Sequence, residues 1–114
     1  ANPSSMEVAL DNIATMEAEH KVLILGDMLE LGEWSSEAHQ TILRKADGIA
    51  ERIILVGNEF AKAYNASEEL HSNYVLYSTT SEALVALGDN PINDSLVLLK
   101  GSRGIALEKL ISIL

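Results

Sequence analysis

The chain has 114 residues, 47% of them hydrophobic, with 17 acidic residues against 8 basic ones and no cysteine. This length fits one domain, and the formal net charge of −9 disfavours binding to nucleic acid phosphates or to anionic membrane surfaces. The absence of cysteine excludes disulfides and thiolate chemistry and is typical of a reducing cytoplasm. The apolar runs fall far short of the roughly 20 residues that a membrane-spanning helix needs.

The first segment is a helical pattern that begins in a loop. The chain opens on Ala1-Asn2-Pro3-Ser4-Ser5, without an initiator Met, and apolar residues then recur at helical spacing over Ser4–Glu19. Ser4 or Ser5 is expected to cap this helix. We expect a domain excised from a longer protein, covering residues 1–114, with a strand missing before this first helix.

Four apolar runs alternate with helical patterns along the rest of the chain. Each run is continuous in Val, Ile or Leu, as in strands buried on both faces. The predicted strands are Lys21–Gly26, Arg52–Gly57, Asn73–Ser78 and Ser95–Lys100, and the other predicted helices are Ser35–Glu51, Glu59–Tyr64, Ser81–Leu87 and Ile105–Leu114. Ser35 or Ser36 and Thr80 or Ser81 are the expected caps, with Gly88 closing the fourth helix. The alternation predicts a three-layer α/β/α sandwich with a mainly parallel sheet.

The most informative loop is Lys100-Gly101-Ser102-Arg103-Gly104, between the last strand and the last helix. Loops at the carboxyl ends of parallel strands are where α/β proteins bind ligands. Two cations, a hydroxyl and a helix amino terminus suit an anionic group. The alternative is a glycine turn with a solvated Lys and Arg. No Gly-Lys-Ser/Thr phosphate loop occurs in the chain.

A second loop, Gly26 to Gly32, follows the first strand. Asp27 there could orient a metal-bound water or accept from an ammonium group, or it could simply form a turn by bonding its own backbone. A third loop, Gly57-Asn58-Glu59, is expected only to turn the chain and cap a helix.

The remaining polar residues predict no further chemistry. His20, His39 and His71 show no paired spacing, so we expect no zinc site. Glu30, Glu33 and Glu37 are interpreted as a solvated rim rather than a calcium loop. Trp34 follows a loop, and we expect a partly exposed anchor or a contact with a neighbouring domain.

Three segments together carry a resemblance to a family. Ala1 to Met6, Leu25 to Gly32 with His39, and Lys100 to Gly104 resemble the Mur ligases over essentially the full chain, in the right order and spacing. The resemblance is to the type that adds D-alanyl-D-alanine to UDP-N-acetylmuramoyl-tripeptide. It implies a bacterial, cytoplasmic, three-domain enzyme of peptidoglycan synthesis, of which this chain is the Rossmann-like third domain. In that family an acyl phosphate of the substrate is attacked by the incoming amine.

The resemblance also implies roles for particular residues. Asn2 and Pro3 match a segment near the phosphate and acyl centre, and Asp27 and Met28 match a loop that faces the reacting centre. Ser102 and Arg103 match the segment expected to hold the dipeptide carboxylate, while Asn2 and Lys100 face the nucleotide. ATP and Mg²⁺ are expected in the parent enzyme, bound mainly by the absent central domain. The partners implied are the dipeptide, the UDP-linked tripeptide and the other two domains. We expect the chain alone to be inactive.

Two other classes stay open on the residues alone. A receiver-type signalling module also carries acids, a hydroxyl and a Lys at strand ends, and Asp27, Thr79 and Lys100 could imitate that set. The third reading is a non-catalytic α/β interaction domain.

Overall fold

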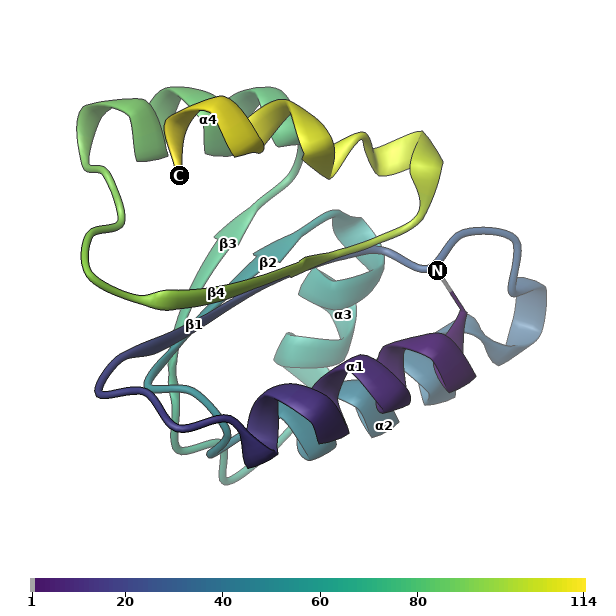
Figure 1. The fold of residues 1–114 in the computed structure, drawn as a ribbon. Coiled ribbons are helices and arrows are strands. Elements are labelled where there is room, and N and C mark those ends of the chain that lie inside the picture. The colour runs from purple at the N-terminus through teal and green to yellow at the C-terminus, as the bar shows by residue number, and fades with distance from the viewer. Residues whose placement is uncertain (1) are drawn as a thin grey trace.

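The computed structural model describes residues 2–114 and confirms the parallel α/β architecture. The sheet has four parallel strands in the order β3-β2-β1-β4 (Figure 1). In chain order the elements are α1 (Pro3–Thr15), β1 (Lys21–Gly26), the 3₁₀ helix η1 (Gly32–Trp34), α2 (Ser35–Ala46), β2 (Arg52–Val56), α3 (Asn58–Ala66), β3 (Asn73–Tyr77), α4 (Thr80–Asp89), β4 (Leu96–Lys100), and the 3₁₀ helices η2 (Arg103–Ile105) and η3 (Leu107–Ile113).

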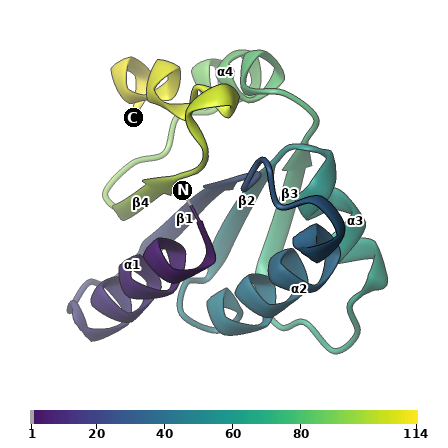
Figure 2. The same cartoon turned by 90° about the vertical axis from the view of Figure 1, so that its right-hand side faces the viewer.

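Two apolar clusters bury the two faces of the sheet, which makes three layers. Side chains alternate along each strand, so Leu23 and Leu25 of β1 join the cluster under α1, α2 and α3. Val22 and Ile24 join the opposite cluster, under α4 and η3. Figure 2 shows α1 and α2 below the sheet and α4 with the carboxyl-terminal segment above it.

The expected caps at the starts of α1, α2 and α4 are wrong, and so is the expected end of α4 at Gly88. Asn2, not Ser4 or Ser5, caps α1, and its side chain accepts from the Ser5 N–H at 2.9 Å within a capping box. Thr79 caps α4 through the Glu82 N–H, and Gly88 lies inside that helix instead of ending it. A cap residue needs extended backbone, which Asn2 and Thr79 have. At the start of α2 no side chain caps the helix, since Trp34 occupies the cap position in a helical conformation.

The second helix ends at Ala46 instead of continuing to Glu51, because Asp47 turns outward to bind the loop before β3. Its carboxylate accepts from the backbone N–H groups of His71 and Ser72 and from the Tyr74 hydroxyl. Burial alone would raise the pKa of Asp47, but the hydrogen bonds from Ser72, Tyr74 and His71 outweigh it and hold that pKa below its usual range. Burial and the same carboxylate raise the pKa of Tyr74.

The predicted last helix, Ile105–Leu114, is instead two 3₁₀ segments. Ala106 has φ of +59° and separates them, because a left-handed residue cannot continue a right-handed helix. The Thr80 hydroxyl donates to the Ile105 carbonyl and ties this break to the start of α4.

The connections place a topological switch point between β1 and β4. From β1 the chain passes through α2 to β2 on one side, whereas β4 lies on the other side of β1 and is followed by η3 on the opposite face of the sheet. The loops that follow these two strands therefore leave the sheet in opposite directions. Ligands of open α/β sheets bind in the crevice this creates.

No helix within residues 2–114 is long and apolar enough to cross a membrane.

Candidate functional site

The structure brings together the loops after β1 and β4 and the amino termini of α1 and α3. All four lie at the edge of the sheet where the strands end, because α1 and α3 each begin at that edge. The segments that the sequence singled out (Asn2-Pro3, the Asp27 loop and Lys100 to Gly104) thus share one edge.

Asp27 is buried, with 4% of its surface exposed, and its carboxylate binds backbone amides of α3. One oxygen accepts from the Glu59 N–H at 3.0 Å and the other from the Phe60 N–H at 2.9 Å. The positive end of the α3 dipole adds to this interaction. The expectation that Asp27 bonds its own backbone is wrong, since its partners lie in another element.

Gly57 makes room for this carboxylate. Its φ is +120°, and a Cβ atom there would lie 2.3 Å from the Asp27 Cγ atom. The Gly57-Asn58-Glu59 loop therefore has a larger role than the turn the sequence predicted, because it lets the start of α3 receive Asp27.

His39 holds the next residue of the loop. The Met28 N–H donates to His39 Nε2 at 3.0 Å, so the ring proton is on Nδ1, which donates to the Ser35 carbonyl at 2.7 Å. His39 is fully buried and contacts the edge of the Phe60 ring. The sequence pointed to no role for His39, and these contacts show a neutral imidazole that fixes the Asp27–Met28 backbone.

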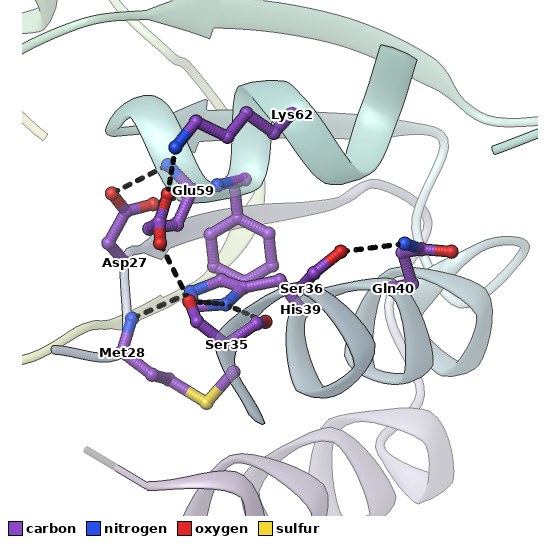
Figure 3. Close-up of polar contacts among 9 residues, drawn as sticks. Asp27, Met28, Ser35, Ser36, His39, Gln40, Glu59 and Lys62 are labelled. Atoms are coloured by element: carbon purple, nitrogen blue, oxygen red, sulfur yellow. Dashed lines mark hydrogen bonds and ion pairs between the residues drawn. The ribbon is translucent and has the colours of Figure 1, made fainter. Parts of the chain in front are cut away.

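Figure 3 shows how this network continues to the surface. The Ser35 hydroxyl donates to the Glu59 carboxylate at 2.8 Å, and the Lys62 ammonium donates to the same carboxylate at 2.9 Å. Lys62 and then Ser35 hold the pKa of Glu59 below its usual range. Ser35, which the sequence suggested as a cap, works as this bridge instead. Sequence periodicity could not reveal the set, because its members come from three elements.

Ser102 joins the β4 loop to the β1 loop. Its N–H donates to the Asp27 carbonyl at 3.1 Å, and its hydroxyl oxygen accepts from the Leu29 N–H at 2.8 Å. Gly101 allows this approach, since a Cβ atom there would lie 2.8 Å from the Gly26 Cα atom. The two loops therefore form one rigid platform.

Two cations flank this platform. Lys100 is half-buried at the end of β4, and Arg103 is exposed at the start of η2. In the part of the chain that the structure describes, Lys45 pairs with Asp11 and Lys62 with Glu59, whereas Lys100 and Arg103 form no ion pair, like the remaining Lys and Arg residues. The position of Lys100 and Arg103, and not the absence of an ion pair, distinguishes them, because both flank the junction of the two loops, where they are available to an anion.

The amino terminus of α1 lies on the Lys100 side of the sheet. Lys100 shares a face of β4 with Leu96 and Leu98, which pack against the cluster containing Met6 and Leu10 of α1. Asn2 is exposed, and its side chain is engaged in the capping box, while Pro3 opens the helix. Asn2 and Lys100 therefore lie on the same face and edge of the sheet.

The residues present do not fit a resident metal ion or a phosphate loop. Within residues 2–114 no group of three His, Cys, Asp or Glu side chains is placed to hold a metal. Asp27, an acid of the β1 loop, is already committed to α3.

Trp34 of η1 has 66% of its surface exposed, which confirms the expected exposure, while a contact with a neighbouring domain stays a prediction. It lines a groove of about 290 Å³ between α1 and α2, together with Pro3, Glu7, Glu37, Ala38, Thr41 and Ile42. Glu30, Glu33 and Glu37 are exposed, as expected of a solvated rim.

Comparison with known proteins gives consistent matches. The family model described as "Mur ligase, glutamate ligase domain" matches residues 1–103. The chain is 37% identical, over 96% of its length, to the UDP-N-acetylmuramoyl-tripeptide–D-alanyl-D-alanine ligase of Treponema pallidum. A crystal structure of MurF from Acinetobacter baumannii matches 98% of the chain with 28% identity and a TM-score of 0.77. MurF from Thermotoga maritima in complex with ADP matches 99% of it with 19% identity and a TM-score of 0.74, which shows the shared fold.

The chain spans about a quarter of the length of each of these proteins.

Proposed function

Because this chain belongs to the Mur ligase family, we propose that it is the substrate-closing, carboxyl-terminal domain of an ATP-dependent ligase. The reaction would join D-alanyl-D-alanine to UDP-N-acetylmuramoyl-tripeptide in the bacterial cytoplasm during peptidoglycan precursor synthesis. The names of the relatives support this substrate pair, since they are D-alanyl-D-alanine-adding ligases.

The observation that carries the proposal is the placement of two cations, Lys100 and Arg103, beside the loop platform. D-Alanyl-D-alanine ends in a carboxylate, which a planar guanidinium binds through two parallel hydrogen bonds. Arg103 is exposed on η2, where its guanidinium can reach a ligand above the platform. Holding the carboxylate there would leave the dipeptide amine directed away from this domain.

The other platform residues would act by keeping Arg103 in place. Ser102, immediately before it, is bonded to both Asp27 and Leu29, so the start of η2 cannot shift without breaking the junction of the two loops. Direct substrate contact stays a prediction for Asn2, Pro3, Asp27, Met28 and Ser102. Burial of the Asp27 and Met28 side chains favours a role in holding the loop.

The acid activated by ATP, the nucleotide and Mg²⁺ would belong to other domains of the same polypeptide. ADP in the Thermotoga maritima relative supports nucleotide use in the family. The contribution of this chain would be to position the amine substrate, with Lys100 on the side of the platform that faces the nucleotide. Such sites are commonly completed by domain closure.

A receiver-type module is less well supported. Two of the residues that could match a receiver site instead make structural contacts: Asp27 accepts from the amides of α3, and Thr79 caps α4. The family match favours the ligase over a receiver and over a non-catalytic interaction domain.

The test replaces Arg103 in the full-length ligase. Arg103→Ala removes a charge-assisted bond worth about 1.5–3 kcal/mol, so KM for D-alanyl-D-alanine should rise on the order of ten- to a hundredfold. KM for ATP should change little. Arg103→Lys keeps the charge but loses the planar guanidinium with its two parallel donors. Its KM for D-alanyl-D-alanine should therefore lie between those of the wild type and Arg103→Ala. Arg44→Ala, an exposed position on α2, is the charge-matched control.

An unchanged dependence on dipeptide in Arg103→Ala, or an equal effect of Arg44→Ala, would remove Arg103 from the substrate site. Ligation by the 114-residue chain alone would overturn its assignment as one part of a divided active site.

A further inference from the structure

Arg103 stands on a short helical turn that has few hydrogen bonds of its own. η2 is closed by two backbone bonds, from the Ile105 N–H to the Ser102 carbonyl and from the Ala106 N–H to the Arg103 carbonyl, both at 3.0 Å. A single turn of 3₁₀ helix has poor hydrogen-bond geometry and does not hold its shape unaided. The direction in which Arg103 points is therefore set by the contacts that anchor the two ends of η2.

The first end of η2 is joined to the β1 loop. Ser102 is bonded to the backbone of Asp27 and Leu29. Gly104 brings the turn against the same loop, since a Cβ atom at Gly104 would lie 2.7 Å from the Leu29 Cδ1 atom. These contacts fix the start of η2, whereas its far end depends on another element.

The far end of η2 is joined to α4, which is not part of the platform. The Thr80 hydroxyl donates to the carbonyl of Ile105, the last residue of η2. Thr80 is the first residue of α4 and has 7% of its surface exposed, and the cap of that helix is supplied by Thr79 instead. The one hydrogen that the Thr80 hydroxyl can donate therefore serves η2 and not its own helix.

The backbone just after this bond has a conformation that its neighbours must hold. Ala106 has φ of +59°, which is unfavourable for a residue with a Cβ atom and persists only where surrounding contacts fix it. On one side is the bond between Thr80 and Ile105. On the other side Leu107 is buried against Gly26, where a Cβ atom would lie 2.9 Å from the Leu107 Cδ1 atom. Without the Thr80 hydroxyl, Ala106 and the end of η2 would be held from one side only.

We propose that Thr80 is a positioning residue for the dipeptide, because it fixes the end of η2 and so directs the Arg103 guanidinium toward the substrate carboxylate. This inference rests on the function proposed for Arg103, and Thr80 would act through Arg103 without touching the substrate. A guanidinium on a fixed backbone loses less conformational freedom when it binds. Thr80 lies on the α4 face of the sheet and Lys100 on the α1 face, so loss of the Thr80 bond should leave the nucleotide side of the platform unchanged.

Kinetics of the full-length ligase test this role through the loss and the return of one hydroxyl. Thr80→Val keeps the shape of the side chain but has no donor, so KM for D-alanyl-D-alanine should rise roughly two- to thirtyfold, with KM for ATP nearly unchanged. Thr80→Ser restores the donor and should return the dipeptide KM close to the wild-type value. Thr80→Ala removes the same donor without a branched side chain at the helix start, and gives the same comparison if Thr80→Val does not fold.

Thr15→Val is the matched control. Thr15 also donates to a backbone carbonyl, that of Asn12 at 2.9 Å, but it is exposed at the end of α1, at the opposite edge of the sheet. Its replacement should change neither KM.

A second measurement reads η2 directly and does not depend on the ligase reaction. Hydrogen–deuterium exchange of the full-length protein, resolved at single amides, follows the Ile105 and Ala106 N–H groups that close η2. Both should exchange on the order of tenfold faster in Thr80→Val than in the wild type or Thr80→Ser, whereas the amides of β1 should be unchanged.

Faster exchange in η2, together with a raised dipeptide KM that Thr80→Ser restores, would support the positioning role. An unchanged dipeptide KM in Thr80→Val, in an enzyme where Arg103→Ala raises it, would overturn this inference and leave the proposed function intact. Equal rises of KM for dipeptide and ATP, an equal effect of Thr15→Val, or unchanged exchange in η2 would also overturn it. If Arg103→Ala leaves the dipeptide KM unchanged, the proposed function itself fails, and the positioning role of Thr80 fails with it.

Discussion

Removing the carboxylate of Asp27 should unfold the start of α3 from the sheet edge, and the cost can be worked from its contacts. The side chain is 4% exposed and accepts two hydrogen bonds at 2.9 and 3.0 Å. Hydrogen bonds to a charged group contribute about 1.5–3 kcal/mol each, whereas exposed helix caps contribute about 0.5–2 kcal/mol in total. Because the two bonds join a buried carboxylate to a helix amino terminus, we take a value between these two ranges and expect Asp27→Ala to lower the free energy of unfolding by about 2–4 kcal/mol.

Asp27→Asn retains one acceptor and should lose roughly half of that amount. Urea unfolding followed by circular dichroism gives both values, provided that the slope of the transition is unchanged. Glu33→Ala removes the same charge from an exposed residue of η1 and should change stability by less than about 0.5 kcal/mol. A loss below about 1 kcal/mol in Asp27→Ala, or a loss equal to that of Glu33→Ala, would refute the reasoning from burial and bonding.

Two further predictions concern Gly57 and Asp47. Gly57→Ala should lower the free energy of unfolding by at least about 2 kcal/mol, because the residue has a positive φ and its Cβ atom would clash with Asp27. The loss should be smaller in an Asp27→Ala background, which a double-mutant cycle measured by urea unfolding would show. If Gly57→Ala destabilises the Asp27→Ala variant as much as the wild type, the predicted clash between residue 57 and Asp27 is contradicted. Because the pKa of Asp47 is lowered on folding, its carboxylate stabilises the folded state fully at pH values above the pKa of the unfolded chain, about 3.9. This stabilisation is lost as the pH falls through the pKa of the folded state. The stability difference between wild type and Asp47→Asn should therefore shrink below about pH 4, and a constant difference from pH 6 to pH 2 would contradict it.

Strand positions were predictable because burial on both faces leaves a local signature. Val22 to Leu25 and Ile53 to Val56 read as continuous apolar runs and occupy the two central strands. Helix ends were less predictable, since Ser4 and Ser5 are as good chemically as Asn2, and only the backbone conformation decides among them. The carboxyl-terminal segment forms two 3₁₀ helices instead of one α-helix because Ala106 has a left-handed backbone conformation. An alanine gives no indication of that conformation in the sequence.

The candidate site was predictable in its location but not in its internal contacts. Loops after parallel strands share one edge, so Asp27 and Lys100 to Gly104 were expected together. The partners of Asp27 lie more than 30 residues away in α3, and the bond between His39 and Met28 spans two elements. Such contacts depend on tertiary packing, and spacing along the chain does not reveal them.

The commitment of Asp27 to α3 also shapes the electrostatic field of the domain. At physiological ionic strength charges are screened beyond about 8 Å, so most of the 17 acids act weakly at the platform. The Asp27 carboxylate accepts from two amides of α3, and the positive end of that helix dipole offsets part of its charge. An anion approaching from bulk solution would therefore meet only weak, screened repulsion from the acidic surface, and attraction only close to the two cations. Capture of the proposed carboxylate ligand at this edge would depend on close fit and domain closure more than on long-range steering.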